Sequence, residues 1–185
     1  MTPSNLLFAA LFLACGGGSG TTDTGTTADS GTVGTTDTAP VDETCHDNLV
    51  LSGGKSFGEC GGTCIWAVTL SDNAARLIVS DWDGTVHADN SGVITPGGLS
   101  AACGAANALA GDTLDSVYGC PDCADGGASN AAIERSGIRS VHEWETGNPP
   151  EILADVAALL DELMDALDSC NGTSKLAPGA DCTPL

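Results

Sequence analysis

The sequence predicts an α+β domain, in which a small antiparallel sheet carries two helices on one face and disulfides cross-link the whole. Two observations predict this class. Short apolar runs bounded by turn residues alternate with two stretches of helical periodicity, and all but one of the nine cysteines follow residue 44. Packing both helices on one face is the simplest way to bury their apolar sides.

Short apolar runs predict the strands. They cover residues 65–70, 76–81 and 85–88, and later a hairpin of residues 131–135 and 138–145 around Ser136-Gly137. Asp83-Gly84 is typical of a two-residue hairpin turn. We therefore expect three strands, a helix, two strands and a final helix.

Helical spacing predicts the two helices. The first is marked by Leu99, Ala102, Cys103, Ala106 and Leu109 and is expected to end at Gly111. In the second, Asn148 is expected to cap, with Pro149 and Pro150 in the first turn. Its apolar face comprises Ile152, Val156, Leu159, Leu160, Leu163, Met164 and Leu167. Its acidic residues are expected to form a solvated surface; they are Asp155, Asp161, Glu162, Asp165 and Asp168.

The charge balance excludes one class of partner. The 185 residues include 25 acids and only 5 Lys plus Arg, which gives a net charge of −20. A charge of this sign repels phosphate backbones, so we expect no nucleic-acid partner. The length fits one domain, and a hydrophobic content of 42% is enough for a core.

The N-terminus has the pattern of an export signal. Residues 6–14 are all apolar, whereas a membrane-spanning helix needs about twenty such residues. This run, ending in Leu13-Ala14-Cys15, resembles the signal of bacterial lipoproteins, although residues 1–5 lack Lys and Arg and Phe12 replaces the usual Leu. The resemblance implies cleavage after residue 14, lipidation of Cys15 and, because Gly16 follows, an outer-membrane location. An ordinary cleaved signal with a coincidental Cys15 is the alternative.

A polar segment separates this signal from the rest of the chain. Residues 16–44 are nearly all Gly, Ser, Thr, Asp and Ala, and cannot bury enough apolar area to become ordered. We therefore divide the chain into a signal peptide (1–14), a lipidated Cys and disordered tether (15–44) and a disulfide-rich domain (45–185).

The cysteines of the domain indicate disulfides. They are Cys45, Cys60, Cys64, Cys103, Cys120, Cys123, Cys170 and Cys182. In an exported protein this even number predicts up to four bridges, each worth about 2–4 kcal/mol. Cys120 with Cys123 is the preferred local pair and Cys60 with Cys64 is possible, while the other pairings stay open.

Two other interpretations of these cysteines remain. Cys60, Cys64, Cys120 and Cys123 have adequate spacing for a four-thiolate zinc site, although thiols oxidise after export. Cys120-Pro-Asp-Cys123 also has the form of a redox dithiol. Asp122 and Asp125 disfavour the thiolate there. We expect no metal and no cofactor.

Three further patterns have weak chemical signatures. Gly54-Lys55-Ser56 ends like a phosphate-binding loop, but Leu49 occupies the required glycine position, so a Gly-rich entry loop is expected. A weak calcium site competes with a plain hairpin at Asp81, Asp83 and Asp89. The histidines are expected at the surface; they are His46, His87 and His142, the last beside Glu143.

The order of elements carries a second resemblance. A Gly-rich opening at residues 52–58, a sheet, a helix and a hairpin lead to Asn148-Pro149-Pro150 and a Leu-rich terminal helix. This order is similar to that of emfourin-type inhibitors of thermolysin-like metalloproteases, and implies protease inhibition without identifying an inhibitory residue. The many cysteines and the tether depart from that family.

The sequence favours a surface-tethered, non-catalytic binding domain in the cell envelope, facing an oxidising compartment. Its partner would be an envelope protein or polymer. Trp66, Trp82 and Trp144 either form the binding surface or pack in the core. Protease inhibition and thiol-disulfide exchange through Cys120 and Cys123 are the alternative functions.

Overall fold

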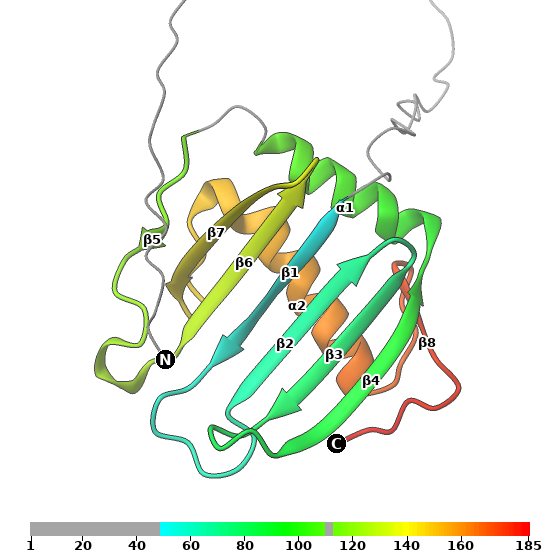
Figure 1. Ribbon diagram of the computed structural model, residues 1–185, viewed down its shortest axis with the longest axis horizontal. Coiled ribbons are helices and arrows are strands. Elements are labelled where there is room, and N and C mark those ends of the chain that lie inside the picture. Colours follow the sequence, from blue (N-terminus) through cyan, green and yellow to red (C-terminus); the bar gives the residue numbers. More distant parts are fainter. Residues whose placement is uncertain (1–48, 110–112) are drawn as a thin grey trace, which may run out of the picture. The chain divides into compact units, whose positions relative to one another are not determined.

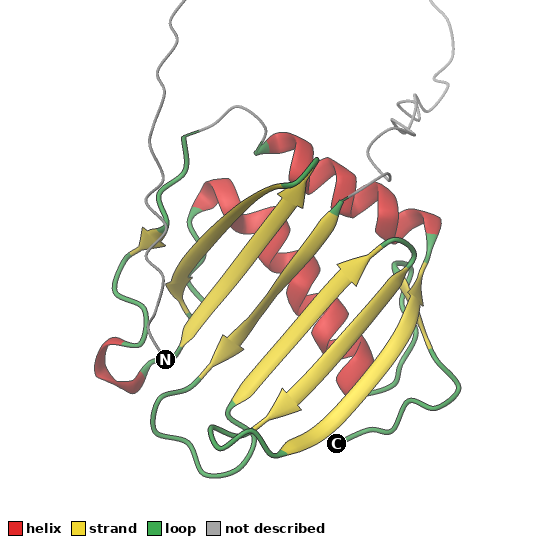
Figure 2. Cartoon of the chain, viewed as in Figure 1, coloured by secondary structure: helices red, strands yellow, loops and turns green. Residues whose placement is uncertain are grey.

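The computed structural model describes residues 49–109 and 113–185, which form an eight-stranded sheet and two helices (Figures 1 and 2). The expected signal peptide, Cys15, the tether, Cys45, His46 and Gly111 lie outside the described residues. Within the described part of the chain, no helix is long and apolar enough to cross a membrane.

The sheet is larger than the sequence predicts. Its strands, in chain order, are β1 (Val50–Ser56), β2 (Ile65–Ser71), β3 (Ala74–Ser80), β4 (Val86–Ile94), β5 (Val117–Tyr118), β6 (Ala128–Arg135), β7 (Ile138–Glu145) and β8 (Leu176–Pro178). Their spatial order is β5-β7-β6-β1-β2-β3-β4-β8. Since β5 pairs with β7 in parallel and the other pairs are antiparallel, the sheet is mixed. The α+β class is confirmed, whereas the small, purely antiparallel sheet is wrong.

Strand β1 corrects the expected Gly-rich entry loop. It lies between β6 and β2, in the middle of the sheet. Its paired glycines, Gly53 and Gly54, look like loop residues in the sequence because glycine weakens a strand pattern. A Cβ atom at Gly53 would lie 2.6 Å from Leu160 Cδ1, so the missing side chain lets the second helix pack directly on β1.

Both helices lie on one side of the sheet (Figure 1). Helix α1 (Pro96–Ala108) begins where Thr95 Oγ1 accepts a hydrogen bond from the Gly98 N–H (3.1 Å). It therefore starts earlier than predicted, and its last residue precedes Leu109.

The start of helix α2 (Ala154–Asp168) also differs from the prediction. Asn148 does not cap it, because its amide donates to Glu145 Oε2 (3.4 Å) and a 3₁₀ turn, Glu151–Leu153, comes before the helix. Ile152 is 43% exposed, and Leu153 takes the buried place instead. The other predicted apolar residues, from Val156 to Leu167, are buried as expected.

A buried asparagine joins the sheet to the C-terminal segment. Asn90, on the helix side of β4, donates through Nδ2 to the carbonyls of Leu167 (2.9 Å) and Thr183 (3.0 Å). Its Oδ1 accepts from the Thr183 N–H (3.0 Å). These three hydrogen bonds satisfy the buried side-chain amide of Asn90. They join β4 to the end of α2 and to the C-terminal segment around Thr183.

Disulfides cross-link three short segments of the described chain. The pairs are Cys60–Cys64, Cys120–Cys123 and Cys170–Cys182, with Cα–Cα distances of 5.6, 5.5 and 5.7 Å. Both predicted local pairs are confirmed. Because each of these two pairs is closed on itself, the joint four-thiolate zinc site is wrong. Cys103 is disulfide-bonded as well.

The contact at Gly53 gives a stability prediction. Gly53→Ala should lower the free energy of unfolding by about 1–3 kcal/mol, because the new methyl group would lie 2.3 Å from the Asn130 carbonyl oxygen of β6 and 2.6 Å from Leu160 Cδ1 of α2. Gly104→Ala is the matched control: nothing lies within 4 Å of its Cβ position, and in α1 this change should add about 1 kcal/mol. Urea unfolding of both variants measures the difference. Equal effects would mean that the close approach at Gly53 is unimportant.

Candidate functional site

A cleft opens between one end of the sheet and helix α2. Its volume is about 280 Å³, and charged, hydroxyl and aromatic side chains share its lining. The lining includes Lys55, Ser129, Trp144, Thr146, Asp161 and Asp165. A concave site with a few convergent polar groups is the usual form of a small-molecule site.

Strand register brings the sheet residues of the cleft together. Lys55 pairs with Trp66 on one side and with Ser129 on the other, and Ser129 pairs in turn with Trp144. Directly paired residues share a face of the sheet, so this row of four crosses β2, β1, β6 and β7 on the side that carries α2. The fold therefore sets a lysine beside a hydroxyl between two indole rings.

The ammonium group of Lys55 is positioned by an aromatic ring. Its Nζ lies 5.6 Å from the centroid of the Trp66 ring, within the range of a cation–π interaction. Phe57 packs edge-on against the same ring, with centroids 6.0 Å apart and an interplanar angle of 86°. These contacts place the amine over the Trp66 ring, while Lys55 itself lines the cleft.

Helix α2 contributes the negative charges. Asp161 and Asp165 are one helical turn apart and both line the cleft. Asp161 is exposed, but partial desolvation in the cleft raises the pKa of its carboxyl; the positive charge of Lys55 counteracts this rise, and the negative charge of Asp165 adds to it. The carboxylates thus repel each other while one of them interacts with the lysine across the cleft.

Apolar and hydroxyl groups complete the lining. Trp144 is only 3% exposed, and it lies in the core with Leu160 and Met164 of α2. Ser129 Oγ donates a hydrogen bond to Thr146 Oγ1 (3.2 Å) beside this wall. The cleft therefore offers an apolar surface together with one positive and two negative groups.

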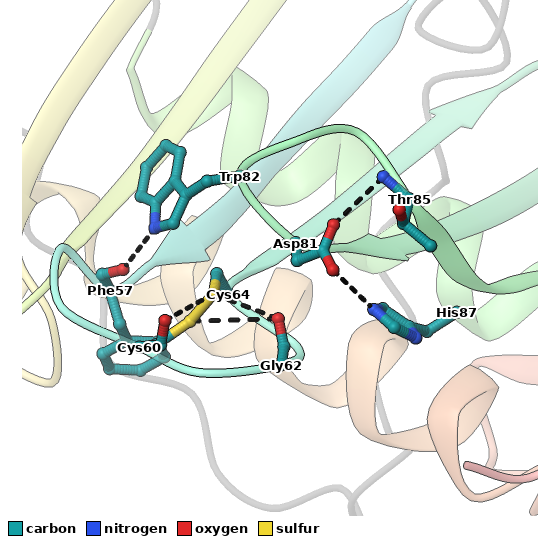
Figure 3. The surroundings of a disulfide bond; sticks show 8 residues. All are labelled: Phe57, Cys60, Gly62, Cys64, Asp81, Trp82, Thr85 and His87. Carbon is teal, nitrogen blue, oxygen red and sulfur yellow. Dashed lines mark hydrogen bonds and ion pairs between the residues drawn. A yellow bond between two sulfur atoms is a disulfide. The ribbon is translucent and has the colours of Figure 1, made fainter.

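The loop closed by Cys60–Cys64 contacts the β3–β4 turn (Figure 3). Trp82 Nε1–H donates to the Phe57 carbonyl (2.9 Å), which joins the two segments. Asp81 accepts from the Thr85 N–H (3.0 Å) and lies 3.2 Å from His87 Nε2.

The three candidate calcium ligands do not converge. Asp81 and Asp83 cap the turn, and hydrogen bonds from Asp81 and Thr85 lower the pKa of Asp83 to about 2. Asp89 instead forms a two-point ion pair with Arg76 (2.6 and 2.7 Å). In residues 49–109 and 113–185, no group of three or more His, Cys, Asp or Glu side chains could hold a metal ion.

The strand histidines have different environments. His87 is exposed, as expected. His142 is 3% exposed, so its predicted surface position is wrong; Nδ1 lies 2.8 Å from the Asp115 carbonyl and, since a carbonyl only accepts, carries the proton. Four strands separate β4 from β7, so the two rings do not form one site. Glu143, adjacent in a strand, faces the other side of the sheet.

The tryptophans do not form a common binding surface. Trp144 is in the core, Trp66 packs against it, and only Trp82 is largely exposed, at 55%. Core packing, the alternative interpretation, therefore holds for Trp144. Sequence reasoning missed the cleft; the predicted hairpin began at Ala131, and only the longer β6, from Ala128, pairs Ser129 with Trp144. Without β1, nothing linked Lys55 to this row.

The surroundings of Cys120–Cys123 are acidic. Asp122 and Asp125 adopt left-handed backbone conformations (φ 58° and 59°) in the turn that holds the disulfide. The Cys120 N–H donates to Glu145 Oε1 (3.1 Å). Three carboxylates near one disulfide disfavour the thiolate that redox exchange requires.

The shifted pKa of Asp161 predicts a pH-dependent gain in stability. A pKa raised by folding means that the ionised carboxyl destabilises the native state above that pKa, and that the penalty vanishes below the unfolded value of about 3.9. Asp161→Asn should therefore stabilise the protein at pH 7, by about 0.5 kcal/mol because solvent screens this carboxyl, and have no effect at pH 3.

Urea unfolding at the two pH values measures this effect. Asp72→Asn, in the exposed β2–β3 turn, removes the same charge from the protein without altering the cleft. Equal gains from both variants would show that only the total charge matters.

Comparisons with known proteins identify no relative: no family model, curated protein or solved structure matches the chain. The resemblances to lipoproteins and to emfourin-type inhibitors therefore stay predictions.

Proposed function

We propose that this chain is a non-catalytic binding protein of the cell envelope. In this proposal Cys15 carries a lipid, residues 16–44 form the tether, and the domain binds its partner in the cleft beside α2. Short disulfides on the described domain support a location in an oxidising compartment, where such bonds persist.

The cleft is the observation that carries the binding function. It combines Lys55 with Asp161 and Asp165 next to the apolar wall of Trp144. Its volume of about 280 Å³ suits a single small polar unit, either free or at the end of an envelope protein or polymer. Two cations outside the cleft form ion pairs, Arg76 with Asp89 and Lys175 with Glu162.

Membrane anchoring predicts a defined behaviour for Cys15→Ser. The native protein should partition into the detergent phase and have the mass of the chain from Cys15 plus its acyl groups, because the lipid supplies the membrane affinity. The variant should remain in the aqueous phase. Phase separation and intact mass spectrometry measure both properties. A native mass without acyl groups would contradict lipidation, whatever the partitioning.

Binding in the cleft predicts a second result. Among small amines, carboxylates, amino acids and monosaccharides, at least one should raise the melting temperature of the native protein saturably, since a ligand stabilises the state it binds. Ser129→Phe or Thr146→Phe should abolish the shift by filling the cleft. Thr69→Phe, on the exposed side of β2, should retain it.

Two results of the same melting measurements would contradict binding in the cleft. A shift that survives both cleft-filling substitutions would place binding elsewhere on the domain. No saturable shift with any member of the panel would remove the proposed cleft function.

A further inference from the structure

The charges of the cleft are held apart. Lys55 is near enough to Asp161 for its charge to act on that carboxyl. Among the described residues, the ion pairs within 4.0 Å are Arg76–Asp89, His87–Asp81 and Lys175–Glu162, and Lys55 belongs to none of them. The Lys55 amine instead lies 5.6 Å from the centroid of the Trp66 ring, and the lysine and the two aspartates line the same cleft.

Each side of the cleft favours a different ligand charge. An ammonium group near α2 would relieve the repulsion between Asp161 and Asp165, two exposed carboxylates that line the same cleft. A carboxylate near β1 would neutralise Lys55, which pairs with no acid of the described chain within 4.0 Å. The hydrogen-bonded hydroxyls of Ser129 and Thr146 add polar contacts on the sheet side.

A ligand with one charge meets opposition on the other side. A simple carboxylate would bind Lys55 but approach two aspartates within a protein of net charge −20. A simple amine would bind the aspartates but be repelled by Lys55. Only a molecule with both charges satisfies both sides at once, and its apolar part would then contact Trp144, Leu160 and Met164.

We infer that the cleft binds a small zwitterion of the α-amino acid class, with its ammonium group at Asp161 and Asp165 and its carboxylate at Lys55. The volume of about 280 Å³ lies at the lower end of ligand pockets, which matches one amino acid rather than a long peptide. This inference rests on the proposed binding function and assigns its ligand chemistry.

Calorimetry on the native protein in detergent tests the inference with matched probes. The probes are L-leucine, L-methionine and L-alanine, together with isopentylamine and 4-methylpentanoate, which are leucine without its carboxylate and without its ammonium group. At least one amino acid should bind saturably. If leucine binds, both single-charge analogues should bind at least tenfold more weakly. If only methionine or alanine binds, its own amine and acid analogues serve in the same comparison.

Two variants test which side recognises which charge. Lys55→Gln should weaken amino acid binding at least tenfold and strengthen binding of the amine, because the repulsive cation is gone. Asp161→Asn should weaken amino acid binding and strengthen binding of the acid. Lys175→Gln, whose partner Glu162 does not line the cleft, is the control and should change none of the three affinities.

The opposing results separate this inference from the proposed function. If an amine, acid or sugar binds and is lost in Ser129→Phe, while no amino acid binds better than its single-charge analogues, the zwitterion inference is overturned and the cleft function stands. The inference is also overturned if Lys55→Gln weakens amine and amino acid equally. If no probe of either panel binds, both are overturned.

Discussion

The direct packing of helix α2 on β1 is the constraint on which the rest of the structure depends. Gly53 has no side chain, so Leu160 Cδ1 of α2 lies within 2.6 Å of the position that a Cβ atom would occupy. Leu160 also lines the cleft, and its neighbour Asp161 faces Lys55 across it. The same close approach thus packs the helix on the core and contributes Leu160 to the candidate site.

The opposite end of α2 is fixed by different means. Asn90 hydrogen-bonds the Leu167 carbonyl at the end of the helix and both backbone groups of Thr183 in the tail. The Cys170–Cys182 disulfide closes the intervening segment. This end of α2 is therefore bound to β4 through Asn90 and followed by a covalently cross-linked segment.

The sequence predicts the features that depend on neighbouring residues better than those that depend on contacts between distant segments. The apolar face of α2 from Val156 to Leu167, the turn at Ser136-Gly137 and the short Cys120–Cys123 bridge depend on neighbours in the chain, and all three are confirmed. Strand β1 pairs with β2 and β6, and β6 is distant in the sequence. Its glycines weaken the strand pattern, so the sequence alone does not predict it. His142 was misplaced for the same reason, since its partner is the carbonyl of a loop that returns to β7.

Lys55 lines the cleft but forms no ion pair with an acid of the described chain within 4.0 Å. The chain has 25 acids and only 5 Lys plus Arg, and two of these cations, Arg76 and Lys175, pair with acids within 4.0 Å. Lys55 instead lies over Trp66, opposite acids that it does not reach. An ion pair within the cleft would neutralise both sides and leave a ligand little electrostatic energy to gain. Keeping the charges apart leaves their attraction available to a molecule that carries the complementary pair.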